Sequence, residues 1–326
     1  MKKSYYIISI LFFFMMSITK AQDPHFTQFY ANPIYLNPAF AGSAICPRVI
    51  MNYRNQWPAI PAAYVTYNAS YDQYIKNMSG GVGLMLTSDN AGEGVLQTNT
   101  VSGIYSYSAS ISPSFSIKAG FQATLRQINL DWEKLYFGDQ IDARLGFVYI
   151  TNEKCPEELN LLMPDFSAGI LGYSENFYAG FAVHHLTTPD EGFIATSYLP
   201  RRYTAHIGCV ISTEQHRRRR KLEDPYISPN LLFMKQRDFE QMNYGLYFNK
   251  YPFVTGLWFR QGFDNPDAFI VLIGIQTSVM KFGYSYDVTV SKLASASGGS
   301  HEISWIMQLP CRERPVRYRR IVCPTF

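Results

Sequence analysis

SFSIKAGFQATLR, residues Ser114–Arg126, alternates between apolar side chains and all other types at every position. Its odd-numbered residues, from Phe115 to Leu125, are all apolar, whereas its even-numbered residues include Lys118 and Arg126. Period-two alternation over this length predicts a β-strand with one apolar face. A soluble β-sandwich buries such a face, and an outer-membrane barrel turns it toward lipid around a polar lumen. The stretch is compatible with both folds.

The N-terminus has the pattern of a secretory signal peptide. Lys2 and Lys3 precede the apolar run Tyr5–Met16, and small residues lead to a cleavage site after Ala21. We therefore expect residues 1–21 to be removed on export. Their removal takes away three lysines and no acids, so the formal charge falls from +4 to +1. This charge gives no electrostatic argument for a nucleic-acid partner.

The rest of the chain lacks an apolar run long enough for a membrane helix. A spanning helix needs about 20 apolar residues, whereas the longest run here, Ala268–Ile275, has the eight residues AFIVLIGI. A membrane location therefore requires a closed barrel, because lipid tolerates no open sheet edge. Between residues 46 and 309 we predict fourteen strands, most of them near the ~9–11 residues that a tilted strand needs to span the bilayer. They are 46–54, 63–71, 80–87, 98–107, 115–126, 165–173, 177–184, 202–212, 226–235, 241–249, 253–261, 267–276, 279–287 and 300–308.

The lengths of the connections favour the barrel over the sandwich, which remains the competing fold. Short connections at 174–176, 250–252 and 277–278 alternate with longer ones at 56–62 and 88–97. Bacterial barrels have even strand numbers, with short periplasmic turns and longer outer loops. The two sets fall on opposite sides only if residues 127–165, including Gly146–Ile150, add no net strand. We therefore expect an all-β, fourteen-stranded outer-membrane barrel over 46–309, with 127–165 as a long outer loop.

Residues 22–45, QDPHFTQFYANPIYLNPAFAGSAI, show no alternation and are rich in aromatic residues. Two Asn-Pro pairs favour turns, because the residue before a proline is pushed out of the helical region. So many aromatic side chains are unusual for a solvated linker. We expect a plug-like segment that begins in the periplasm and packs in or near the lumen. Its assigned residues are Phe26, Phe29, Tyr30, Asn32, Pro33, Asn37 and Pro38.

Two basic segments are expected at the periplasmic rim. One is the run HRRRRK, His216–Lys221, and the other lies in the tail 310–326. Clustered arginines fit docking to an acidic partner or to lipid head groups, and they also fit a solvated turn. The residues concerned are Arg217, Arg218, Arg219, Arg220, Arg317, Arg319 and Arg320. Cys311 and Cys323 flank the tail and either pair or stay unpaired.

No catalytic or metal-binding motif accompanies these features. His184 and His185 end a predicted strand, but no nucleophile signature such as GxSxG occurs near any serine. The acids of the long outer loop do not follow an EF-hand spacing, so we treat them as a solvated face with some partner contact. We expect no enzymatic activity, metal or cofactor. The loop residues that we assign to partner contact are Asp131, Trp132, Phe137, Asp139 and Asp142, the other acids are Glu133 and Asp165, and Trp57, Trp258 and Trp305 are expected in the aromatic girdles.

Several stretches together resemble the PorP/SprF family of outer-membrane proteins from Bacteroidota. The opening QDPHFTQFYANPIYLNPAFAGS at 22–43 carries the resemblance, and it extends over essentially the whole mature chain. The other matching stretches are YRNQWPAIPAAYVTYNASYDQ at 53–73, GVGLMLTSDNAGEG at 81–94, LDWEKLYFGDQID at 130–142, PDFSAGILGYSENFYAGFAVHHL at 164–186 and GYSYDVTVSKLASASGGSHEISW at 283–305. The stretch 213–225 is the least family-like.

The resemblance implies an outer-membrane barrel of the type IX secretion system. Members either belong to the secretion machinery or serve a secreted surface adhesin with a type B C-terminal domain, in gliding and adhesion. We therefore expect the outer loops, chiefly 127–165 and 185–201, to receive or anchor an adhesin. The alternatives are a core machinery subunit that docks periplasmic components and a passive porin.

Overall fold

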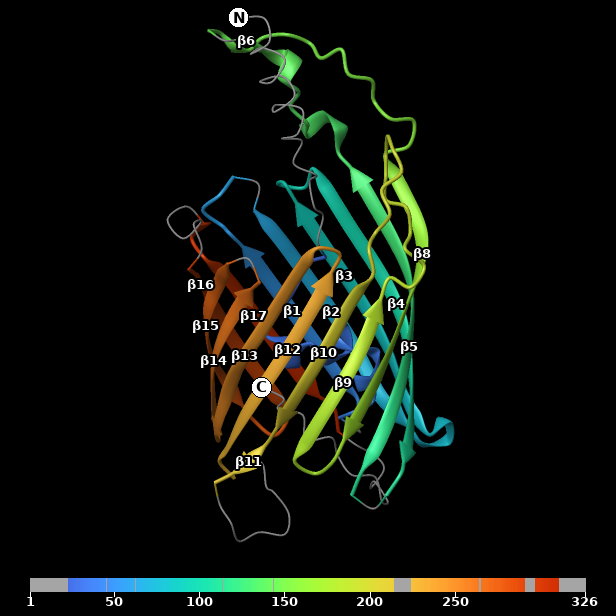
Figure 1. Cartoon of the computed structure of the whole chain (residues 1–326), viewed down its shortest axis with the longest axis vertical. Helices are drawn as coiled ribbons and strands as arrows, with labels where there is room; N and C mark the ends of the chain where they lie inside the picture. The colour runs from blue at the N-terminus through green and yellow to red at the C-terminus, as the bar shows by residue number, and fades with distance from the viewer. Residues whose placement is uncertain are drawn as a thin grey trace, which may run out of the picture.

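Antiparallel strands close into a barrel in this computed structural model, which describes residues 23–44, 46–61, 63–112, 114–142, 144–213, 224–263, 265–290 and 297–310 (Figure 1). The main sheet has 15 strands, but β10 and β11 are two parts of one wall strand interrupted at Val210, which leaves fourteen. The first strand pairs with the last, and β10 pairs with both β9 and β12, so the sheet closes. The predicted fold is confirmed.

The wall strands are β1 (Arg48–Gln56), β2 (Tyr64–Ile75), β3 (Gly80–Ala91), β4 (Leu96–Ser110), β5 (Ser116–Leu130), β8 (Asn160–Tyr173), β9 (Phe177–His184), β10 (Arg202–Cys209), β11 (Ile211–Ser212), β12 (Tyr226–Gln236), β13 (Phe239–Lys250), β14 (Phe253–Gly262), β15 (Pro266–Gln276), β16 (Met280–Thr289) and β17 (Ser300–Gln308). A separate hairpin is formed by β6 (Ile141–Asp142) and β7 (Gly146–Phe147). The short helices are η1 (Phe29–Ala31), α2 (Pro33–Leu36), η2 (Pro38–Phe40), η3 (Lys76–Met78), η4 (Trp132–Lys134) and η5 (Gly138–Gln140). None of the described helices has the length and apolar character needed to span a membrane.

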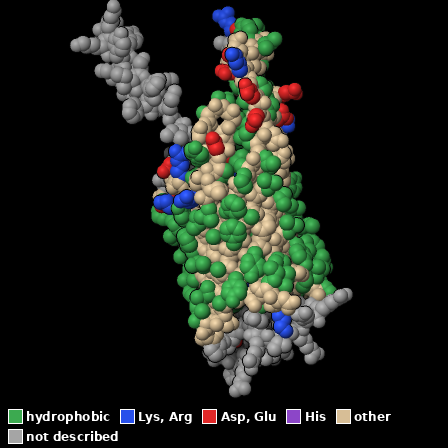
Figure 2. Space-filling view, turned by 90° about the vertical axis from the view of Figure 1, so that its right-hand side faces the viewer, with side chains coloured by type: hydrophobic (Ala, Val, Ile, Leu, Met, Phe, Trp, Pro, Cys, Tyr) green, Lys and Arg blue, Asp and Glu red, His purple; other side chains and the backbone are tan. Residues whose placement is uncertain are grey.

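The β5 strand settles the choice between the two folds. The Phe121 side chain is 50% exposed on the outer surface, whereas Lys118, on the opposite face, is only 2% exposed. The apolar face therefore points outward and the polar face points into the lumen, as in a membrane barrel. Hydrophobic side chains cover the middle of the outer wall, and acidic and basic side chains gather above them (Figure 2).

The connections divide between two ends of the barrel. At the turn end, connections such as 76–79, 174–176 and 277–279 are short; at the loop end lie 131–159, 185–201 and the other long loops. This confirms the predicted alternation, although the β11–β12 connection at the turn end is itself long. Because outer-membrane barrels have short periplasmic turns, we assign the turn end to the periplasm and the loop end to the exterior.

Several wall strands are longer than the sequence predicts, among them β4, β5 and β8. β4 and β5 each have 15 residues and β8 has 14, so the predicted bounds 98–107, 115–126 and 165–173 are too short. At the loop end of β4 and β5 the extra outward positions are polar, for example Gln97 in β4 and Gln127 in β5. Strand pairing continues there beyond the apolar belt. Apolar alternation stops at the edge of that belt, so the sequence pattern underestimates the strand length. The barrel wall therefore extends further at the base of the long loop.

Candidate functional site: the lumen plug and the outer loop

Asp23–Ala44, here called the plug, lies inside the barrel (Figure 1, blue). It begins at the loop end, where Asp23 contacts residues of β5 and β10, and it reaches the turn end before β1 starts. The expectation that this segment enters from the periplasm is therefore wrong for the described residues. The plug makes ionic contacts with the wall at more than one level of the lumen. The sequence alone did not reveal which residues form them.

The first contact is a histidine held between two carboxylates. His185 Nε2 lies 2.5 Å from Asp23 Oδ2, and His185 Nδ1 lies 2.6 Å from Oδ2 of Asp165 in β8. A carboxylate accepts hydrogen bonds, so both ring nitrogens donate and the imidazole is protonated. Asp165 was expected among the solvated acids; it is instead 2% exposed and faces the lumen. This Asp23–His185–Asp165 arrangement ties the start of the plug to the wall.

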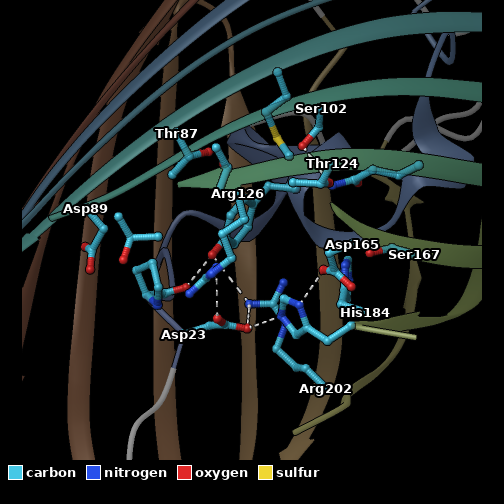
Figure 3. A pocket seen from close by; sticks show the side chains of 17 residues that line it. Asp23, Thr87, Asp89, Ser102, Thr124, Arg126, Asp165, Ser167, His184 and Arg202 are labelled. Carbon is cyan, nitrogen blue, oxygen red and sulfur yellow. Dashed lines mark hydrogen bonds and ion pairs between the residues drawn. The ribbon is translucent and has the colours of Figure 1, made fainter. Parts of the chain in front are cut away.

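Two arginines complete this cluster. Arg202 Nη1 lies 3.4 Å from Asp23 Oδ2, and Arg126 Nη1 lies 3.8 Å from Asp23 Oδ1. Arg126 also pairs with Glu191 at 2.5 Å. The Gln236 amide donates to Asp23 Oδ2 at 3.2 Å and accepts from the Asp23 backbone N–H at 3.2 Å. Figure 3 shows Asp23 from the plug facing Arg126 and Arg202 from the wall.

The charges shift the pKa values of the cluster in opposite directions. Burial alone raises the pKa of Asp23, but His185, Arg202 and Arg126 outweigh it and hold that pKa well below its ordinary range. Burial alone lowers the pKa of His185, but Asp23 and Asp165 outweigh it and raise that pKa. Both effects favour the charged forms. The plug is therefore held here by an ionic contact over a wide pH range.

A polar cavity of about 50 Å³ adjoins the cluster (Figure 3). It is roomy enough for ordered water. Gln122 Oε1 lines it and has no partner among the described residues, so a water molecule that donates a hydrogen bond to this oxygen is its natural partner. The hydroxyl, amide and carboxylate side chains of its wall include Thr87, Asp89, Thr98, Thr100, Ser102, Gln122 and Thr124.

The second contact joins the plug to Glu302 in β17. Its carboxylate accepts the backbone N–H groups of Thr27 at 2.6 Å and Gln28 at 3.0 Å. Arg54 in β1 donates to Glu302 at 3.1 Å and to Asp287 in β16 at 3.0 Å. Arg54 and Glu302 face each other across the pair that joins the first and last strands. The plug thus bridges the two ends of the sheet.

Aromatic side chains fill the lumen beside these charges. Phe29 lies 5.5 Å from Trp258, and Tyr30 lies 5.7 Å from Tyr178, measured between ring centroids. Trp258 is 2% exposed, so its predicted place in an outer girdle is wrong. Its position in β14 has the inward parity of Arg260, which places the indole against the plug. Trp305, in contrast, lies on the outward face with Ile303.

At the turn end, the plug backbone lies directly on glycines of the wall. A Cβ atom on Gly120 in β5 would lie 2.3 Å from Ala39 N, and one on Gly81 in β3 would lie 2.1 Å from Ala41 O. Lys118 donates to Ala41 O at 2.6 Å. Only residues without a side chain permit this approach. The plug therefore fits a groove that the inward face of the strands leaves open.

Of the plug residues assigned from the sequence, Phe26, Phe29, Tyr30, Asn32, Pro33, Asn37 and Pro38 are all buried. Asn37 donates to Ile170 O at 3.0 Å and accepts from Ala39 N at 2.9 Å. The charged anchors Asp23, Arg54 and Glu302 escaped the sequence analysis. Their signal was available, since charged side chains at inward positions of a strand need a partner in the lumen.

Residues 131–159, here called the outer loop, stand above the wall and are braced internally. Asp142 accepts the backbone N–H groups of Arg144 at 2.8 Å and Leu145 at 3.0 Å, and these bonds hold its pKa below the ordinary range. Asp139 accepts from the Asn152 N–H at 2.7 Å. These two acids therefore shape the loop, in addition to any contact with a partner. Trp132 and Phe137 lie with their ring centroids 4.9 Å apart.

Large apolar side chains of the outer loop remain in contact with solvent. Tyr136 is 77% exposed, Leu145 is 73% exposed and Ile150 is 91% exposed. Exposed apolar clusters of this kind mark protein contact surfaces. Among the described residues, no group of three or more His, Cys, Asp or Glu side chains is placed to hold a metal ion. The loop is suited to binding a protein.

The remaining assignments fall outside the described residues. They are Arg217, Arg218, Arg219 and Arg220, Arg317, Arg319 and Arg320, and the pair Cys311 and Cys323. Their proposed roles stay predictions.

Comparisons with known proteins fit this geometry. The family model described as "Type IX secretion system membrane protein PorP/SprF" matches residues 18–307. The curated proteins give no match. The toluene transporter TbuX of Ralstonia pickettii has a TM-score of 0.50 and 8% identity, over 85% of this chain and 93% of TbuX.

Two further solved structures are also similar. For the CymD monoaromatic hydrocarbon channel the TM-score is 0.44 at 10% identity, over 87% of this chain and 94% of that one. For Omp33 of Acinetobacter baumannii it is 0.43 at 10% identity, over 82% and 100%. Such identities establish likeness of fold alone. Fold and family together make this protein an outer-membrane β-barrel.

Proposed function

Because this chain belongs to the PorP/SprF family of type IX secretion system membrane proteins, we propose that it receives or anchors a secreted surface adhesin with a type B C-terminal domain. We propose a binding role without enzymatic activity. The observation that carries the proposal is the outer loop, whose braced backbone presents Tyr136, Leu145 and Ile150 to the exterior. Exposing such side chains costs free energy, and contact with a partner recovers it.

The plug supports the same proposal. It occupies the lumen and is fixed by buried charges at Asp23 and Glu302. A barrel filled in this way is a poor conduit for solutes and a firm support for surface loops. The passive porin is therefore the weaker alternative.

The first test removes the outer loop from the intact barrel. Residues 133–157 are replaced by a short Gly-Ser linker, which spares β5, β8 and the buried Asp165. We expect barrel assembly to be kept and surface retention of the adhesin to be lost. Retention is measured by surface labelling of whole cells. Normal retention with the linker variant contradicts the proposal. A Glu133→Gln variant, changed at one exposed position of the loop, is the matched control.

A core machinery subunit is the second candidate function. The run Arg217–Arg220 falls between β11 and β12 in the sequence, outside the described residues, and we expect it at the periplasmic rim. A periplasmic basic segment suits docking to acidic periplasmic components. Replacing Arg217–Arg220 with serine is expected to stop secretion of all cargo under this alternative. Under the adhesin proposal, one adhesin at most is affected.

Affinity purification from detergent-solubilised outer membranes separates the two candidates. Recovery of one large surface protein supports the adhesin role, and recovery of periplasmic components supports the machinery role.

A further inference from the structure

The β8 strand has an edge that its neighbour covers only in part. On one side β8 pairs with β5 along Asn160–Tyr173. On the other side β9 pairs with it only along Ala168–Tyr173. Residues 160–167 therefore lack a wall strand on this side, and the loop 185–201 bonds there to the backbone of Pro164 and Phe166. A closed barrel normally has no free edge, so this segment at the loop end is unusual.

Backbone hydrogen bonds show which groups of the strand face that edge. Leu159 O accepts from Leu130 N at 2.9 Å, so odd-numbered residues of this segment bond toward β5. Backbone groups of successive residues point to opposite sides of a strand. Even-numbered residues therefore face the uncovered edge, and Phe166 O does accept there from Leu186 N at 2.9 Å.

The next even positions show how far the loop covers the edge. Pro164 O accepts from the Thr187 hydroxyl at 3.4 Å. Proline has no N–H to offer, and it is tolerated in a sheet where the N–H would face no strand. Beyond it, the N–H and C=O groups of Leu162 and Asn160 have no strand partner among the described residues. The Leu162 side chain is 64% exposed.

We propose that the edge at Asn160–Met163 binds an extended segment of the secreted partner, which adds a strand to β8. Unpaired main-chain donors and acceptors in register are satisfied best by another main chain. The exposed Leu162 side chain offers an apolar contact to the added strand of the partner. The edge also continues directly from the outer loop, so one partner contacts both surfaces. This inference rests on the proposed adhesin role and specifies the mode of binding.

A proline at position 162 tests the edge selectively. Leu162→Pro removes the N–H that faces outward and leaves the hydrogen bonds to β5 intact, because Leu162 does not bond toward β5. Leu162→Val keeps the N–H and an apolar side chain, and it is the matched control. The probe is the purified C-terminal domain of the surface protein that the wild-type chain retains. We expect Leu162→Pro to weaken binding by about five- to tenfold and Leu162→Val to leave it within about twofold.

Amide hydrogen exchange on the full-length wild-type protein gives a second measurement that needs no variant. Addition of the probe is expected to slow exchange at Leu162 and to leave Val101, within the paired wall, unchanged. Unaltered exchange at Leu162, or normal binding by Leu162→Pro, overturns strand addition and leaves the adhesin role standing. If the wild-type protein retains no surface adhesin at all, the proposed function fails, and strand addition fails with it.

Discussion

Asp23 Oδ2 lies 2.5 Å from His185 Nε2, although the two residues are 162 positions apart in the chain. The contact joins the start of the plug to the loop that follows β9. Because His185 also donates to Asp165 in β8, a single imidazolium links the plug to the wall. The stability of the plug therefore depends on buried charge as well as on apolar packing.

Neutralising Asp23 is expected to loosen the plug. In Asp23→Asn, the cationic His185 and Arg202 lose the carboxylate that they share, and breaking a buried ion pair in this way costs about 3–5 kcal/mol. We expect the folded barrel to convert to the unfolded form at a lower temperature, measured by heat modifiability on SDS gels. We also expect faster proteolysis within residues 23–44. Asp131→Asn is the control, because Asp131 pairs with Lys134 at the surface, where both are at least 40% exposed. Equal stability of the two variants contradicts the ionic anchor.

Stability is expected to fall as the pH rises through the pKa of His185. That pKa is raised in the folded protein, so the stabilisation is complete below the unfolded value of about 6.5 and disappears above the folded value. The lowered pKa of Asp23 acts at the other end, and its contribution is lost only as the pH falls below about 4. Asp165, Glu191, Arg126 and Arg202 also face this cluster.

Thermal unfolding of the wild type and His185→Gln between pH 5 and pH 10 checks this prediction. The wild type is expected to lose stability toward alkaline pH, and His185→Gln to start lower and to vary less. Parallel curves for the two proteins indicate that His185 does not carry the pH dependence.

A side chain at Gly120 is expected to displace the plug. Its Cβ atom alone would lie 2.3 Å from Ala39 N, so Gly120→Leu is incompatible with the observed position of the plug. Overpacking of this kind costs about 1–3 kcal/mol or more. We expect the variant to show stepwise ion conductance in planar bilayers that the wild type lacks. Gly103→Leu is the control, because nothing lies within 4 Å of a Cβ there. High conductance of the wild type itself favours the porin alternative.

Trp258→Ala is expected to destabilise the protein much more than Trp305→Ala. The first variant opens a cavity against Phe29 and Tyr30, at a cost of about 3–5 kcal/mol. The second removes an indole from the outward face, where lipid refills the space. Denaturant unfolding in detergent micelles measures both. A larger effect at Trp305 contradicts the inward placement of Trp258.

The sequence by itself determined the alternating strands and favoured a barrel over a sandwich. Alternation in Ser114–Arg126, the parity of the strands and the alternation of short and long connections are local features, because each strand must present one face to lipid and one to the lumen. The aromatic, proline-rich segment before β1 likewise predicted a plug. Once the medium outside the wall is known to be lipid, the same alternation places Phe121 on the outer surface and Lys118 in the lumen.

Tertiary structure alone decided the direction of the plug and the partners of its charges. Asp23 is joined to His185 across 162 positions of the chain and Thr27 to Glu302 across 275, and no local pattern encodes such pairs. Trp258 was misplaced for the same reason, since an indole suits both a membrane girdle and an aromatic core. The uncovered edge of β8 likewise depends on where β9 ends relative to β5. These features arise from the register of neighbouring strands, which is fixed only when the sheet closes.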